Sequence, residues 1–170
     1  MSVDFRALLR SQFRAALAMH EQCIDVCTEE HWDSPIAKYP FWQVVHHTLC
    51  FLDCYLTPSN DEFKRLVESR AGQPFNPQPK GMSELEDEYP SRRFTREEML
   101  AYAAFCRTKI DETFATETDA SLAGPSGFSW LPFTRAELHL HNLRHVQHHT
   151  GQLTASLRRI GVETRWVKTA

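Results

Sequence analysis

The chain has 170 residues, and a chain of this length can form one domain with a substantial buried core. Hydrophobic residues make up 42% of it and charged residues 24%, and 19 basic against 22 acidic side chains give a formal net charge of −3. These values argue against extensive disorder and a strongly basic nucleic-acid-binding surface, and no stretch reaches the roughly 18 to 20 apolar residues of a membrane span.

The first part of the chain predicts two long helices separated by a loop. Apolar residues recur at three- and four-residue spacing from about Val3 to Cys27, as in an amphipathic helix. Pro35 and Pro40 bracket the loop. Pro40 suits the first turn of the second helix, where its missing N–H would have no partner anyway, and we expect this helix to run to about Leu56.

A connection rich in proline and glycine follows the second helix. A short helix is expected over Asp61 to Ser69. The segment from Gly72 to Pro90 cannot form a long helix, and we expect it to be a long connection across one end of the fold.

The third and fourth helices are each predicted to begin at a capping box, a threonine followed three residues later by glutamate. Thr95 begins the third helix, which ends near Thr116, and Thr134 begins the fourth, which ends at Gly161. Four long helices, two long connections and no alternating strand pattern predict an all-α fold, a four-helix bundle with long loops. We expect it to be a single domain over residues 1–170.

The fourth helix carries five histidines, of which His141, His145 and His149 lie along one side. At roughly 100° per residue, His145 and His149 border the apolar stripe of the helix, whereas His141 turns further toward solvent. Spacing of four residues brings two imidazoles within reach of one ion. The same spacing also occurs in helices that bind no metal, where such histidines are surface or core residues.

The second helix offers two further histidines in the middle of an apolar segment. His46 and His47 border two adjacent apolar stripes, and periodicity does not choose between them. One of them together with His145 and His149 would make a three-histidine site, which leaves a coordination position open for water or substrate. An open site implies catalysis, because the ion can lower the pKa of a bound water toward about 7 or activate a thiolate.

Two motifs carry a resemblance to a known family. The stretch HVQHHTGQL from His145 to Leu153, followed by LRRIG ending at Gly161, is similar to the pattern H-x-x-H-H-x-G-Q followed by L-R-x-x-G of the DinB/YfiT-like family. The earlier YPFWQVVHH, from Tyr39 to His47, resembles the second-helix motif of that family. A tryptophan usually begins that motif and a ligand histidine closes it, so Tyr39 departs from the pattern.

The resemblance implies a ligand set of His47, His145 and His149, with His46 in the preceding, non-ligand position. It also implies an up-down-down-up bundle, often dimeric, that holds a divalent zinc or nickel ion, with manganese or iron as other choices. Members of the family include thiol S-transferases that use small thiols such as bacillithiol or mycothiol, and a thiol-dependent isomerase. Many others are described only as metal-dependent hydrolases.

The cysteines suggest a second metal site less strongly. Cys23 and Cys27, and Cys50 and Cys54, repeat the four-residue spacing, and four thiolates could hold an ion. The usual zinc spacing is Cys-x-x-Cys, so we interpret these residues, together with Cys106, as packing residues.

Other residues near the histidines have weaker signals. Gln152 lies one turn beyond His148 and could form a hydrogen bond near the metal, or simply cap a polar face. Asp53 lies roughly 120° around its helix from His47 and is not expected to be a ligand. Three aromatic residues of the loop before the fourth helix could line a pocket, although anchoring the loop on the core is the favoured interpretation. They are Phe128, Trp130 and Phe133.

The leading hypothesis is therefore an enzyme in which a three-histidine metal centre activates water or a thiol for hydrolysis or thiol transfer on a small molecule. A non-catalytic metal- or small-ligand-binding module in stress response is the alternative, and a helical interaction protein without metal is the third. We expect a small-molecule substrate and a homodimer, with no nucleic-acid or membrane partner. Five cysteines, an odd number, and an N-terminus without an apolar signal core predict a cytoplasmic location.

Overall fold

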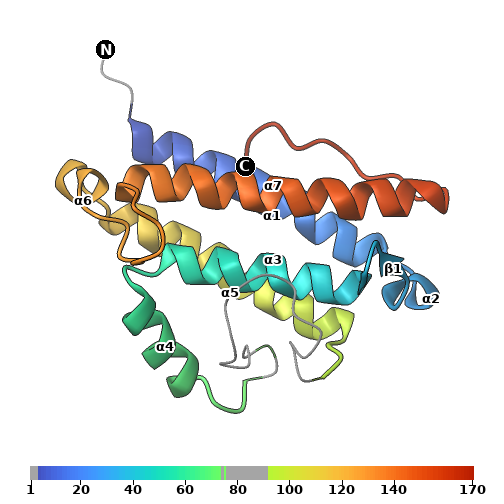
Figure 1. The fold of residues 1–170 in the computed structure, drawn as a ribbon. Helices are drawn as coiled ribbons and strands as arrows, with labels where there is room; N and C mark the ends of the chain where they lie inside the picture. Colours follow the sequence, from blue (N-terminus) through green and yellow to red (C-terminus); the bar gives the residue numbers. More distant parts are fainter. Residues whose placement is uncertain (1–3, 74, 76–91) are drawn as a thin grey trace.

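The computed structural model describes residues 4–73, 75 and 92–170, and four long helices form its centre (Figure 1). They are α1 (Phe5–Val26), α3 (Phe41–Leu56), α5 (Arg96–Thr116) and α7 (Arg135–Arg159). Helices α1 and α7 run in one direction and α3 and α5 in the other (Figure 1). Both α1 and α3 pack against α5 and α7, so the helices form an up-down-down-up bundle. The predicted all-α fold is confirmed.

Shorter elements connect these helices. They are α2 (Glu29–Trp32), β1 (Pro35–Ile36), β2 (Tyr39–Pro40), α4 (Asn60–Ser69) and α6 (Asp119–Ala123). The expectation of no strands was wrong in this one place, because β1 and β2 form a small antiparallel hairpin with a turn at Ala37, whose φ is 55°. Strands of two residues are too short to show an alternating pattern. The hairpin also includes Pro40, so α3 begins one residue later than predicted.

The predicted helix ends are set by local hydrogen bonds. Thr95 and Glu98 form the complete capping box of α5. At α7 only half of the predicted box is found, in which the Thr134 hydroxyl accepts a hydrogen bond from the Glu137 N–H. At the other end of α7, Gly161 has a φ of 79°, and its N–H donates to the Arg158 carbonyl at 3.1 Å. This left-handed residue completes a Schellman motif, which is why the helix stops there.

The long connection between α3 and α5 follows from the topology. Since the two helices run in the same direction, the chain must return along the length of the bundle between them (Figure 1). Helix α4 occupies the first part of this return, close to the predicted range. Most of the segment expected to cross one end, Gly72 to Pro90, lies outside the described residues. The helix ends that flank the connection, however, lie at opposite ends of the bundle.

The core lies between the four helices and makes α3 the most enclosed of them. Every residue of α3 except Trp42 is buried, since this helix packs against α5 on one side and α7 on another. Its two apolar stripes therefore both face protein. His46 and His47 are buried as a result, but toward different neighbours. Within the described part of the chain, no helix has the length and hydropathy needed to span a membrane.

Candidate metal centre

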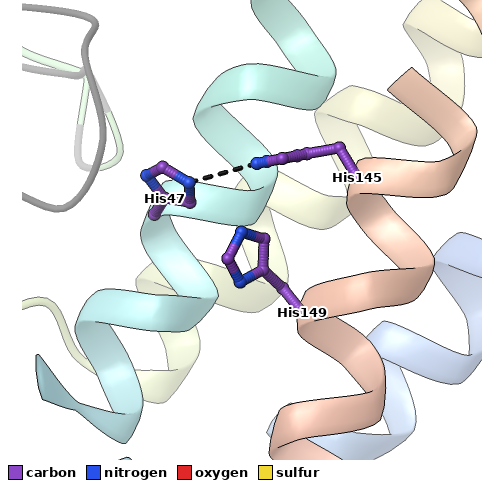
Figure 2. Close-up of side chains that lie close together, drawn as sticks. All are labelled: His47, His145 and His149. Carbon is purple, nitrogen blue, oxygen red and sulfur yellow. Dashed lines mark hydrogen bonds between the residues drawn. The ribbon is translucent and has the colours of Figure 1, made fainter. Parts of the chain in front are cut away.

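Three histidines from two antiparallel neighbouring helices converge between them (Figure 2). His47 comes from the middle of α3, and His145 and His149 come from consecutive turns of α7. Residues four positions apart lie on one face of a helix, so both α7 rings point toward α3. The structure thus brings together the three side chains that the resemblance implied.

The distances suit a shared cation. The Nε2 atoms of His47 and His145 are 3.1 Å apart, and one nitrogen from each of the three rings lies within 4.8 Å of the others. Nitrogen ligands that share one divalent ion at about 2.0–2.1 Å lie roughly 3 to 4 Å from one another. The group found among the described residues contains these three histidines alone, without a carboxylate or a thiol.

Gln152 fixes the orientation of the His149 ring. Its side-chain Oε1 lies 2.8 Å from Nδ1 of His149, and an amide oxygen can only accept, so Nδ1 carries the proton. The neutral ring therefore has its lone pair on Nε2. The amide nitrogen of Gln152 in turn lies 3.3 Å from Nε2 of His148, which is exposed. The prediction of a hydrogen bond from Gln152 near the centre is confirmed.

Burial keeps the three imidazoles neutral. It lowers the pKa of His47 to about 3 and that of His145 to about 2, with a smaller contribution from a charge on His149. Burial also lowers the pKa of His149, although the Gln152 hydrogen bond opposes this effect. The ring of Phe51 covers the cluster at 4.7 Å from the His47 ring and 5.3 Å from the His145 ring.

Without a cation, this arrangement is poorly satisfied. Of the facing Nε2 atoms of His47 and His145, only one can carry the proton that joins them. Whichever does, the Nε2 lone pair of His149 receives no proton from the other two rings. A divalent ion would accept the facing lone pairs together, so the donor set fits a metal.

His46 points to the other side of α3. It is fully buried, and its ring stacks on Phe94 at 4.4 Å with an interplanar angle of 5°. The ring of Tyr102, on α5, is 6.1 Å away. The structure therefore groups His47, and not His46, with the histidines of α7.

The other residues considered from the sequence lie around the cluster without joining it. His141 is half-buried, with its ring 5.7 Å from Tyr55 and 5.6 Å from Phe133. In the preceding loop, Phe128 is buried against Tyr55, as expected of an anchor, whereas Trp130 remains 48% exposed. All five cysteines are buried and form no disulfide, and they form no metal-binding group in the described residues.

Sequence reasoning missed the ionic network at the start of α7. The carboxylate of Glu117 accepts hydrogen bonds from Arg135 at 2.9 Å and from His139 at 3.0 Å. The guanidinium of Arg135 also donates to the last carbonyls of α3, which are those of Tyr55, Leu56 and Thr57. This network joins the ends of the two helices that carry the three histidines. The only sign of this network in the sequence was a charged residue, Arg135, directly after the predicted N-cap Thr134.

Asp53 belongs to a second buried network and not to the histidine cluster. Its carboxylate binds Arg70 at 2.6 Å and the Tyr102 hydroxyl at 3.0 Å, and it also pairs with Lys109. A charge in the middle of an apolar helix needs such partners. The expectation that Asp53 is not grouped with His47 agrees with this arrangement.

A cavity of about 490 Å³ lies beside these networks, and none of the three clustered histidines lines it. Its charged lining includes Lys109, Glu117 and Arg135. Lys109 is bound to Asp53, while Glu117 and Arg135 are bound to each other. Three of the cavity's five charged side chains are therefore already paired, and the histidine cluster, whose donor atoms face one another, is the stronger candidate.

Comparison with known proteins assigns the chain to a family. No curated protein matches it. The family model of the DinB superfamily, however, matches residues 12–153, a range that includes all three clustered histidines and most of the four long helices. With most of its length covered, the chain belongs to the DinB superfamily.

Proposed function

We propose that the protein is a metal-dependent enzyme whose three-histidine centre activates water or a small thiol. The observation that carries this proposal is the convergence of His47, His145 and His149, with nitrogen atoms within 4.8 Å and no carboxylate or thiol in the group. Three protein ligands leave a tetrahedral ion one position short, and an open position is typical of catalytic centres. The reaction would be hydrolysis or thiol transfer on a small electrophilic molecule.

The residues of the chain would hold and orient the reacting partners. His47, His145 and His149 would bind the ion through neutral nitrogens, and Gln152 would keep His149 in the correct tautomer. Phe51 would limit the access of bulk water to the cluster. When bound, a divalent ion would supply Lewis acidity, which favours the deprotonated form of a water or thiol at neutral pH.

The donor set favours some ions over others. Neutral imidazoles suit zinc, nickel, copper and iron, whereas manganese and magnesium prefer oxygen ligands. The family resemblance places zinc or nickel first, with iron or manganese as alternatives. A small thiol as cosubstrate and a homodimeric state are further parts of the proposal that rest on the family resemblance. A cytoplasmic location also belongs to the proposal, and five cysteines that form no disulfide support it.

Turnover tests the proposal. Protein loaded separately with Zn²⁺ and Ni²⁺ would be incubated with a panel of low-molecular-weight thiols and chromogenic electrophiles, and product formation followed. We expect metal-dependent turnover that His149→Ala abolishes. In cobalt-loaded protein, added thiol should perturb the visible spectrum, because it occupies the open position. Stoichiometric metal with neither turnover nor a thiol effect would contradict catalysis and favour the non-catalytic binding module.

A further inference from the structure

A hydrogen bond in the core lies directly behind the histidine cluster. The Nδ1 atom of His20, on α1, is 3.1 Å from the hydroxyl of Thr150, on α7. Both residues are buried, His20 completely and Thr150 with 1% of its surface exposed. Thr150 immediately follows His149. Since consecutive residues lie 100° apart on a helix, His149 can face α3 while Thr150 faces α1.

His20 contacts both helices that supply the cluster. Burial lowers the pKa of His20 to about 3, the nearby Val45 carbonyl on α3 opposes this effect, and a charge on His149 adds a smaller lowering. His20 is therefore a polar group enclosed between α1, α3 and α7, at the level of the three histidines.

The His20–Thr150 hydrogen bond lies where it can restrain the rotation of α7 about its own axis. Apolar packing is non-directional, so it restrains the rotation of a helix about its axis less sharply than a hydrogen bond does. An imidazole nitrogen lies about 6 Å from its helix axis, so a rotation of 10° displaces it by about 1 Å. Metal–ligand distances tolerate shifts of only about 0.2 Å. The angular position of α7 must therefore be well defined for His145 and His149 to bind one ion.

We infer that His20 and Thr150 are a positioning pair, which fixes the rotation of α7 against α1 so that both α7 histidines face His47. This inference rests on the proposed metal centre. Neither residue touches the ion or a substrate in this role. Burying an imidazole and a hydroxyl is not the most stabilising use of two core positions, because a typical hydrogen bond yields little net stability. A role in fixing the orientation of α7 accounts for the presence of His20 and Thr150 in the core.

The next turn of the same interface offers a matched control. The Cys23 sulfur and the Thr154 hydroxyl, again from α1 and α7, are 3.5 Å apart. Thr154 is four residues beyond Thr150, and thus one turn further from the cluster. Replacing either threonine with valine removes one hydroxyl at nearly constant volume. The two variants differ in their distance from the histidines and also in burial, because Thr154 is half-buried.

The test compares Zn²⁺ affinities of metal-free protein, measured by competition with a chromophoric chelator. We expect Thr150→Val to bind Zn²⁺ about 10- to 100-fold more weakly than wild type, the range found for outer-shell partners of ligands. Thr150→Ser, which restores the hydroxyl, should recover wild-type affinity, and Thr154→Val should leave it unchanged. Urea midpoints of the two metal-free valine variants should show that both are folded under the conditions of the binding assay. Cobalt spectra should change in Thr150→Val only.

Equal Zn²⁺ affinity of Thr150→Val and Thr154→Val would overturn the positioning role while leaving the metal centre intact. Failure of wild type to bind Zn²⁺ would instead overturn the centre itself, and the pair's role with it. If Thr150→Val does not fold, His20→Phe removes the same hydrogen bond from the other side. It should weaken Zn²⁺ binding similarly, and unchanged affinity in this variant would also contradict the inference.

Discussion

Helix α7 carries two kinds of buried histidine, and their surroundings differ. His139, near its start, is fully buried, and its Nε2 lies 3.0 Å from the Glu117 carboxylate. His145 and His149, further along the helix, face another imidazole, that of His47, with no carboxylate in the group. His139 thus has an anionic partner within the protein, whereas the other two face further nitrogen donors.

The difference separates a structural histidine from a ligand. An imidazole whose Nε2 donates to a carboxylate has no lone pair there to offer a cation. Three neutral imidazoles whose nitrogens converge present lone pairs to one another, and a cation resolves this arrangement best. Burial alone does not distinguish the two regions, because it lowers the pKa of His139 as well as those of the clustered histidines. The partner of each ring is the informative feature.

The largest expected effect is a loss of stability in a variant that breaks the Glu117–Arg135 network and leaves the three clustered histidines unchanged. Glu117→Gln removes the charge that pairs with Arg135, and breaking a buried pair costs about 3–5 kcal/mol. Urea denaturation of the metal-free protein measures this loss, and Zn²⁺ stoichiometry should be unchanged in the folded variant. Asp111→Asn, which breaks the exposed pair with Arg10, is the control and should cost less than about 1 kcal/mol. Equal losses in the two variants would contradict the buried network.

We expect low pH to reduce the stability that the Glu117 network contributes. Burial tends to raise the pKa of Glu117, but hydrogen bonds from His139, Ser121 and Arg135 outweigh it and lower the pKa to about 2 from an ordinary 4.5. A carboxyl whose folded pKa is depressed contributes stability above its unfolded pKa and loses it as the pH falls. We expect roughly 3 kcal/mol to be lost between pH 4.5 and 2, as followed by urea unfolding. Glu117→Gln should lack this component, and an identical pH profile in the variant would refute its assignment.

A substitution of Gln152 tests the histidine cluster through a smaller effect, a change in Zn²⁺ affinity. Gln152→Leu removes the acceptor that orients His149, so Zn²⁺ affinity should fall about 10- to 100-fold with one ion still bound at saturation. Gln147→Leu, a matched change on α7, serves as the control and should retain wild-type affinity. If both leucine variants bind Zn²⁺ equally well, Gln152 has no orienting role.

The smallest expected effect concerns the helix between the ligands and Gln152. A Cβ atom at Gly151 would meet no atom within 4 Å, so Gly151→Ala should fit without strain. We expect it to stabilise the protein by up to about 1 kcal/mol through helix propensity, measured by urea unfolding, with unchanged Zn²⁺ affinity. A stabilised variant with weakened binding would show that the centre requires local freedom of α7.

Much of the fold could be predicted because its signals are local. Helical periodicity marked the four long helices, and Thr95, Thr134 and Gly161 marked their ends through hydrogen bonds within a few residues. The β1–β2 hairpin was missed because strands of two residues carry no periodic pattern. That the whole chain, residues 1–170, forms a single domain stays a prediction.

The candidate site was only partly accessible from the sequence. Periodicity placed His145 and His149 beside the core, but it could not choose between His46 and His47, because α3 is buried on both sides. The choice depends on how α5 and α7 pack around α3, because this packing turns His47 toward the α7 histidines and His46 toward Tyr102 of α5. Glu117 and Arg135 are 18 positions apart in the sequence, and His20 and Thr150 are 130 positions apart. No local sequence pattern could therefore predict either contact.

Metal content measured by elemental analysis tests the proposed centre most directly. Wild type, the double variant His145→Ala/His149→Ala and the control His139→Ala would each be reconstituted with Zn²⁺ and freed of loosely bound ions. We predict close to one zinc per chain in wild type and in His139→Ala, and none in the double variant. Wild type without zinc after reconstitution, or a double variant that still retains it, would contradict a metal centre at His47, His145 and His149.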